Sequence, residues 1–171
     1  PSKSEQLDAR VAEGQRSYNN KQYSDAAAMF RSVLAARPLD MSAKFYLALA
    51  YKQMNRNEDA LAILETLDMK FQDDQRIAYQ LALLNAQVGK MDNALRHLEQ
   101  AAKDNTRVKE QAKKEPAFAG LAKNPRYKAI VAEDATHQVA QKPKAEPARR
   151  SIEQRFGSML ETANRGLKGI F

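Results

Sequence analysis

The sequence has no cysteine and no tryptophan among its 171 residues. Without thiols it can form neither disulfides nor thiolate metal sites, which fits a reducing compartment and leaves an oxidising one open. It has no apolar run near the roughly 18 residues of a membrane-spanning helix. Alternating β-branched runs, which would indicate strands, are also missing. We therefore expect an all-helical chain in the cytoplasm, with a periplasmic location and a removed signal peptide left open.

Residues that carry chemistry are equally scarce. The two histidines, His97 and His137, have no carboxylate or histidine partner at metal-ligand spacing. No Ser/His/Asp or Cys/His pattern supports a nucleophile. The glycines near the C-terminus follow no strand, as a phosphate-binding loop would require. We expect no catalytic residues, no metal and no cofactor, and a protein that is not an enzyme.

The charge is unevenly distributed. Residues 1–105 contain 14 Lys and Arg against 14 Asp and Glu, whereas residues 106–171 contain 14 against 7, so the net charge of +7 belongs to the C-terminal part. Such a basic region indicates an acidic partner, a membrane surface or nucleic acid. A soluble, solvated tail is the simpler interpretation. Nucleic-acid binding is not expected, because no aromatic residues interleave the charges and no known motif is present.

An internal repeat organises residues 10–106. Ala26, Ala60 and Ala94 follow one another at intervals of 60 − 26 = 34 and 94 − 60 = 34 residues. Twelve places before each alanine stands a small residue, and four places after it stands a bulky one: Gly14, Ala48 and Ala82, then Phe30, Leu64 and Leu98. A fixed period of this length with small residues in phase predicts stacked helical hairpins.

Apolar spacing and capping residues predict where the helices lie. The spacing repeats every 3.6 residues, and polar turns, Pro38 and Gly89 interrupt it. Ser2 and Glu5 have the spacing of a capping box, and Asp40 can cap the helix that follows it. The expected helix pairs cover about residues 4–19 and 24–36, 41–54 and 58–70, and 75–88 and 92–103.

The period and its small residues resemble tetratricopeptide (TPR) repeats, over about residues 5–134. The resemblance implies a right-handed solenoid of three hairpins, with repeats at about 7–40, 41–74 and 75–105. It also implies that the small residues lie where two helices approach closely. Residues 106–134 contain P-x-F-x-x-L and P-R-Y passages similar to the ends of bacterial TPR-like proteins. We expect this capping segment to cover the last apolar face with Phe118, Leu121, Tyr127, Ile130 and Val131.

In TPR proteins the first helix of each repeat lines a concave groove, so the resemblance also implies candidate binding residues. They combine aromatic and leucine side chains with amides and two cations, a composition suited to gripping a peptide. Packing between neighbouring repeats is the alternative role for each of them. The expected groove residues are Gln15, Tyr18, Asn19, Phe45, Tyr46, Leu49, Lys52, Gln53, Arg76, Tyr79, Gln80, Leu83 and Gln87.

The last part of the chain does not follow the repeat. Residues 135–150 are rich in Lys, Ala and Pro and are interpreted as a flexible linker. Residues 151–171 predict an amphipathic helix whose isolated form is weakened by three glycines. Its apolar face consists of Ile152, Phe156, Met159, Leu160, Ala163, Leu167, Ile170 and Phe171.

Together these patterns predict a protein-interaction scaffold that binds a partner peptide or helix in the groove. The C-terminal helix could dock in that groove in its own chain or in a neighbouring one, and the latter would give self-association. The alternative is an adaptor held at a membrane surface by the basic amphipathic helix. The sequence does not name the partner.

Overall fold

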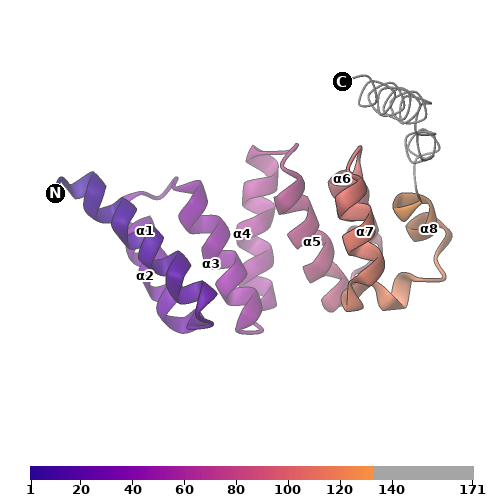
Figure 1. The fold of residues 1–171 in the computed structure, drawn as a ribbon, viewed down its shortest axis with the longest axis horizontal. Coiled ribbons are helices and arrows are strands. Elements are labelled where there is room, and N and C mark those ends of the chain that lie inside the picture. The colour runs from indigo at the N-terminus through magenta and orange to yellow at the C-terminus, as the bar shows by residue number, and fades with distance from the viewer. Residues whose placement is uncertain (133–171) are drawn as a thin grey trace, which may run out of the picture. The chain divides into compact units, whose positions relative to one another are not determined.

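The structure is a computed structural model, and it describes residues 1–132. The predicted linker 135–150, the C-terminal helix 151–171 and His137 lie outside the described residues. The described part is helical throughout, which confirms the predicted fold class (Figure 1). Its elements are α1 (Lys3–Asn19), α2 (Tyr23–Ala36), α3 (Met41–Gln53), α4 (Asn57–Lys70), α5 (Gln75–Gln87), α6 (Met91–Ala102), α7 (Thr106–Lys114), the 3₁₀ helix η1 (Pro116–Leu121) and α8 (Pro125–Val131).

The helix ends follow the local chemistry that the sequence predicts. Ser2 and Glu5 form a reciprocal capping box at the start of α1. The Asp40 side chain accepts from the Ala43 amide at the start of α3. Gly89 has φ of 78°, a left-handed conformation that suits glycine and ends α5 before the turn to α6. All six predicted repeat helices agree with the structure to within one residue at each end.

The repeated small residues pack inside the hairpins. Ala26, Ala60 and Ala94 have no exposed surface, and neither do Ala48 and Ala82. Consecutive helices pack against each other in chain order, so the hairpins α1–α2, α3–α4 and α5–α6 follow one another along the molecule (Figure 1). The 34-residue period therefore marks the close contacts between helices.

Helix α5 belongs to two packed clusters at once. Ile77, Leu81 and Leu84 join the cluster built by α2, α3 and α4. Tyr79 and Leu83 join a second cluster, which α6, α7, η1 and α8 complete. Nine of its thirteen residues are buried. This helix is covered on both sides, unlike α1, which buries only Gly14 and Ser17.

The segment after α6 packs against α5 and α6. Phe118 and Leu121 of η1 and Tyr127, Ile130 and Val131 of α8 are all buried. The Tyr127 hydroxyl donates to the Ala112 carbonyl at 3.0 Å, and this bond joins α8 to α7. Two prolines occupy first helical turns, in η1 and in α8, where their missing N–H costs no hydrogen bond. In addition, η1 lies directly against α5, a contact the sequence did not predict.

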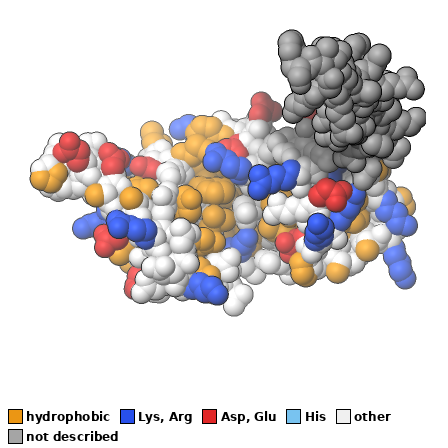
Figure 2. All heavy atoms as spheres, in the orientation of Figure 1, with side chains coloured by type: hydrophobic (Ala, Val, Ile, Leu, Met, Phe, Trp, Pro, Cys, Tyr) orange, Lys and Arg blue, Asp and Glu red, His pale blue; other side chains and the backbone are white. Residues whose placement is uncertain are grey.

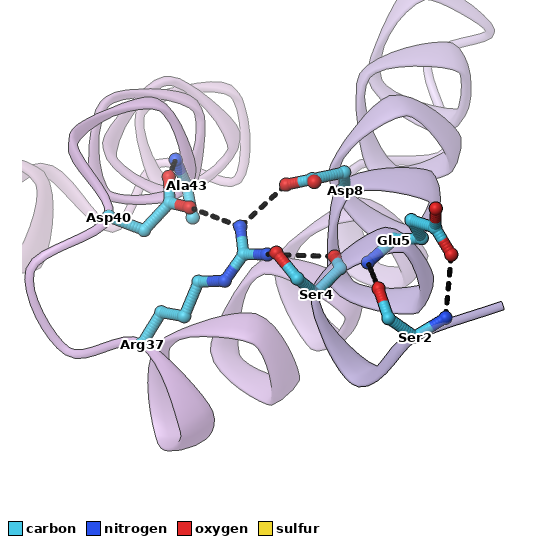
Figure 3. A network of polar contacts seen from close by, with 7 residues as sticks. All are labelled: Ser2, Ser4, Glu5, Asp8, Arg37, Asp40 and Ala43. Carbon is cyan, nitrogen blue, oxygen red and sulfur yellow. Dashed lines mark hydrogen bonds and ion pairs between the residues drawn. The ribbon is translucent and has the colours of Figure 1, made fainter.

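Arg37 ties the N-terminal helix to the next repeat (Figure 3). Its guanidinium donates to the Asp8 carboxylate at 2.6 Å and to both oxygens of Ser4, the carbonyl at 2.7 Å and the hydroxyl at 2.8 Å. It also lies 3.5 Å from the Asp40 carboxylate, which caps α3. The carboxylate of Asp8 holds the pKa of Arg37 above its ordinary value. These contacts fix the loop that joins α2 to α3 against α1.

Candidate functional site

The first helices of successive repeats are joined by side chains from the predicted groove set. Between α1 and α3, the Tyr18 and Tyr46 rings meet edge to face at 6.0 Å between centroids, and Gln15 donates to Ser42 at 3.4 Å. Between α3 and α5, the Lys52 ammonium donates to the Gln80 amide oxygen at 2.5 Å. These contacts show that one continuous face runs across α1, α3 and α5.

A pocket of about 280 Å³ lies on this face between α3 and α5. Phe45 and Tyr46, whose ring centroids are 6.0 Å apart, form its aromatic wall. Met41, Ser42 and Arg76 complete the lining. Hydrophobic side chains gather over α3 in the space-filling view, with Lys and Arg side chains beside them (Figure 2). The pocket thus combines an apolar floor with a cation at its edge.

Arg76 is positioned by the residue that caps its own helix. Asp74 accepts from the Arg76 Nε at 3.1 Å and from Nη2 at 2.7 Å, and it also caps α5 through the Arg76 amide at 2.9 Å. The hydrogen bonds from Arg76 hold the pKa of Asp74 below its ordinary value. The guanidinium lies 5.9 Å from the centroid of the Phe45 ring, and its side chain is 73% exposed. It is therefore oriented over the pocket but remains accessible to a carboxylate or carbonyl oxygen.

The far end of the predicted groove is closed. Tyr79 and Leu83, which we expected to line the groove, are 6% and 7% exposed and belong to the core around Phe118. The Tyr79 and Phe118 rings pack edge to face with centroids 6.2 Å apart. Tyr79 and Leu83 therefore pack in the cluster that contains Phe118, and Leu49, one repeat before Leu83, is buried as well.

Lys52 and Tyr79 lie where the accessible part of this face meets its buried end, and both have shifted pKa values. Burial lowers the pKa of Lys52, and the negative charge of Glu115 acts in the opposite direction. Burial raises the pKa of Tyr79 to about 12, and Glu115 and Tyr127 add to that rise. Glu115, at the start of η1, is therefore close enough to act on both groups. Glu115 was not among the predicted groove residues, because it lies outside the repeat.

The other predicted groove residues lie on the accessible part of this face. Asn19, Gln53 and Gln87 are exposed, while Gln15, Tyr18 and Gln80 are half-buried. Burial raises the pKa of Tyr18, and a hydrogen bond with Gln53 opposes that rise. Met41 and Ser42 also line the pocket, and of the two only Met41 falls outside the groove positions that the repeat implies. Its helical position, one turn before Phe45, was the signal that could have identified it.

The side chain of His97 packs in the interior of the fold. Its side chain is buried in α6, 4% exposed, with Nε2 3.3 Å from the Arg96 guanidinium and Nδ1 without a partner among residues 1–132. Burial, reinforced by the charge of Arg96, lowers its pKa below the ordinary 6.5. The described residues include no group of three or more His, Cys, Asp or Glu side chains arranged to hold a metal ion.

The lowered pKa of His97 predicts a loss of stability in mild acid. Above both pKa values His97 is neutral in both states and contributes no pH dependence. As the pH falls below 6.5 the unfolded chain takes up a proton that the folded chain resists, so the free energy of unfolding should fall. The fall should stop once folded His97 is itself protonated. Urea unfolding at pH 7.5, 6.0 and 5.0 would measure it, and the shallower pH dependence of a His97→Leu variant would assign it. Equal pH profiles for both proteins would contradict the prediction.

Part of the chain matches a known family. Residues 18–84 match the family model described as tetratricopeptide repeat. Residues 18–84 therefore contain tetratricopeptide repeats, which confirms the resemblance that the 34-residue period predicted. Within residues 1–132, no helix has the length and apolar character needed to cross a membrane.

Two solved structures share its fold. One is the crystal structure of PcrH in complex with the chaperone binding region of PopB, which is 20% identical, with a TM-score of 0.56 over 76% of this chain and 97% of that chain. The other is PcrH from Pseudomonas aeruginosa, 19% identical, with a TM-score of 0.57 over 77% of this chain and 96% of that chain. A search of curated proteins finds no match.

Proposed function

We propose that this chain is a protein-interaction adaptor that binds a peptide or helix of a partner on the face formed by α1, α3 and α5. The pocket lined by Phe45, Tyr46 and Arg76 is the observation that carries the proposal. An apolar side chain of the ligand would enter the pocket, and Arg76 would hold a neighbouring carboxylate or backbone carbonyl. The TPR fold supports a binding role, as does the PcrH neighbour, whose structure contains the chaperone binding region of PopB.

The proposed site is smaller than the one inferred from the repeat. Its members are Gln15, Tyr18, Asn19, Met41, Ser42, Phe45, Tyr46, Lys52, Gln53, Arg76 and Gln80, with Gln87 beyond them on α5. Amide side chains along this face can pair with the backbone of an extended or helical ligand. Tyr18 and Tyr46 provide rigid aromatic surface at a low entropy cost.

Residues 151–171 are the proposed ligand within the chain. Their apolar face of eight residues would meet the aromatic wall, in the same chain or in a neighbouring one. A synthetic 151–171 peptide should bind a chain that ends at residue 150. If the docking joins two chains, deleting 151–171 should also lower the number of chains per particle in solution. If the peptide does not bind and the number of chains per particle does not change, the tail is not a ligand of this face. Vesicle binding that depends on 151–171 would instead support the membrane-surface alternative.

Substitutions in the pocket should weaken ligand binding by about tenfold or more, because aromatic and Arg side chains are the usual anchors of an interface. Phe45→Ala removes the aromatic wall, and Arg76→Glu reverses the charge at the edge without altering the core. Peptides selected by display on the chain that ends at residue 150 provide a probe independent of the tail, with affinities measured by fluorescence anisotropy. Val88→Ala is the control, because Val88 is 37% exposed and does not line this pocket. Equal affinity for the wild type and both pocket variants would refute the proposed site.

A further inference from the structure

A second apolar surface lies outside the proposed groove. Leu39 and Met69 are the two most exposed large hydrophobic residues among residues 1–132, at 75% and 72%. Both line one pocket of about 260 Å³, together with Phe71 at the end of α4. Exposed apolar residues that occur singly are ordinary, but here they gather around a hollow.

This pocket continues into a neighbouring one. A hollow of about 250 Å³ between α2, α3 and α4 is lined by Leu34, Leu47 and Ile63. Lys44 and Thr66 line both pockets, so the two form one surface, which we call the α2–α4 surface. Each hollow is below the roughly 300 Å³ typical of small-molecule sites, and a pair of such hollows suits successive side chains of a docked helix.

The α2–α4 surface is on the opposite side of α3 from the groove. Successive residues of a helix turn by about 100° around its axis. Lys44 and Leu47 therefore point away from Phe45 and Tyr46, which line the groove pocket. A partner could occupy the α2–α4 surface while the groove holds its own ligand.

The charge at this surface is positive. Lys44 lines both hollows and Lys70 lines the first. The Lys70 ammonium lies 5.6 Å from the centroid of the Phe71 ring. Neither lysine forms an ion pair with any carboxylate of the described residues, unlike Arg37, Arg56 and Arg76. Two cations beside an apolar surface complement a ligand with leucine-like side chains flanked by carboxylates.

The same charges argue against the chain's own tail at this surface. Residues 149–171 contain five Lys and Arg (Arg149, Arg150, Arg155, Arg165 and Lys168) against Glu153 and Glu161, a net charge of 5 − 2 = +3. Like charges that meet in an interface weaken it. We propose that the α2–α4 surface docks an acidic amphipathic helix of a partner protein, with its apolar side chains in the two hollows and its carboxylates on Lys44 and Lys70.

The test uses the full chain and two matched synthetic peptides. The acidic peptide has about 16 residues, with leucines at i, i+3, i+4 and i+7 and glutamates between them. The matched peptide carries lysine in place of every glutamate. Fluorescence anisotropy gives the affinities, and amide chemical shifts of the ¹⁵N-labelled chain locate the binding. The acidic peptide should bind at least tenfold more tightly than the basic one and should shift the amides of Leu39, Met69 and Phe71.

Variants decide between this surface and the groove. Leu39→Ser with Met69→Ser should weaken the acidic peptide at least tenfold, and Lys44→Glu with Lys70→Glu should reverse the preference between the two peptides. These side chains are exposed or at the pocket rim, and circular dichroism would verify that the variants fold. Val88→Ser, 37% exposed elsewhere, is the control that should change nothing. Arg76→Glu reports binding of the same peptide in the groove, and a larger loss of affinity with Arg76→Glu than with Leu39→Ser and Met69→Ser would overturn the proposal.

Three results would overturn the proposal. They are no binding up to about 1 mM peptide, equal affinity for the two peptides, or shifts confined to α1 and the groove side of α3. A wild-type dimer that Leu39→Ser with Met69→Ser converts to a monomer would assign the surface to a second copy of the chain instead. Shifts confined to the groove would overturn this proposal while supporting the proposed function, so the two proposals can fail separately.

Discussion

Replacing Phe118 with alanine should lower the free energy of unfolding by about 3–5 kcal/mol, the usual cost of emptying a buried aromatic site. Phe118 is 1% exposed and packs against the rings of Tyr79 and Tyr127, each with its centroid 6.2 Å away. It joins η1 to α5 and α8, so its loss leaves a cavity among three elements. Urea unfolding followed by circular dichroism would measure the change at constant pH.

A conservative variant separates packing from a general effect of substitution in η1. Phe118→Leu keeps most of the apolar volume and should cost less than about 1.5 kcal/mol. Hydrogen exchange provides a second measurement, because the amides of α5 should lose protection in Phe118→Ala when η1 no longer holds Tyr79 and Leu83. A loss of less than about 1 kcal/mol, with α5 still protected, would show that η1 does not stabilise this end of the repeats.

The same contact explains where the sequence and the structure differ. Phe45 and Tyr79 occupy equivalent positions in successive repeats, 34 residues apart, so the period assigned both of them to the groove. The structure exposes part of Phe45 at a pocket and buries Tyr79 beneath Phe118. The 34-residue period predicts only contacts that recur in every repeat. The path of residues 116–121 across α5 occurs once, and no spacing within the repeats indicates it.

The features that the sequence predicted correctly are those set by local chemistry or by the period. Capping side chains such as Ser2 and Asp40 accept hydrogen bonds from amides three residues away, so their effect can be inferred from the neighbouring residues in the sequence. The alanines at 26, 60 and 94 are fixed by contacts that recur in every hairpin. Arg37 and Glu115 could not be assigned in this way. Their roles depend on helices that meet only once in the fold.

Gly14 is expected to be the most sensitive small residue of the first hairpin, and Gly14→Val should lower the free energy of unfolding by about 1–3 kcal/mol. A Cβ atom at this position would lie 2.8 Å from Cε1 and 2.9 Å from Cζ of Phe30. Phe30 has no exposed surface, so its ring cannot move away without disturbing its neighbours. Gly120→Val is the matched control. A Cβ there meets only the Met91 Cε at 4.0 Å, and the expected change is within about 0.5 kcal/mol.

The effect of Gly14→Val should also reach the proposed binding face. The Phe30 ring stacks on Tyr46 with centroids 5.7 Å apart, and Tyr46 forms part of the pocket wall. A Phe30 ring displaced by the valine should push on Tyr46, because the two rings are stacked. Peptides that bind the pocket should therefore lose affinity for Gly14→Val and keep it for Gly120→Val, with both proteins measured well below their unfolding temperatures. Unchanged affinity in a destabilised Gly14→Val chain would mean that Phe30 yields in another direction and that the small residue serves the hairpin alone.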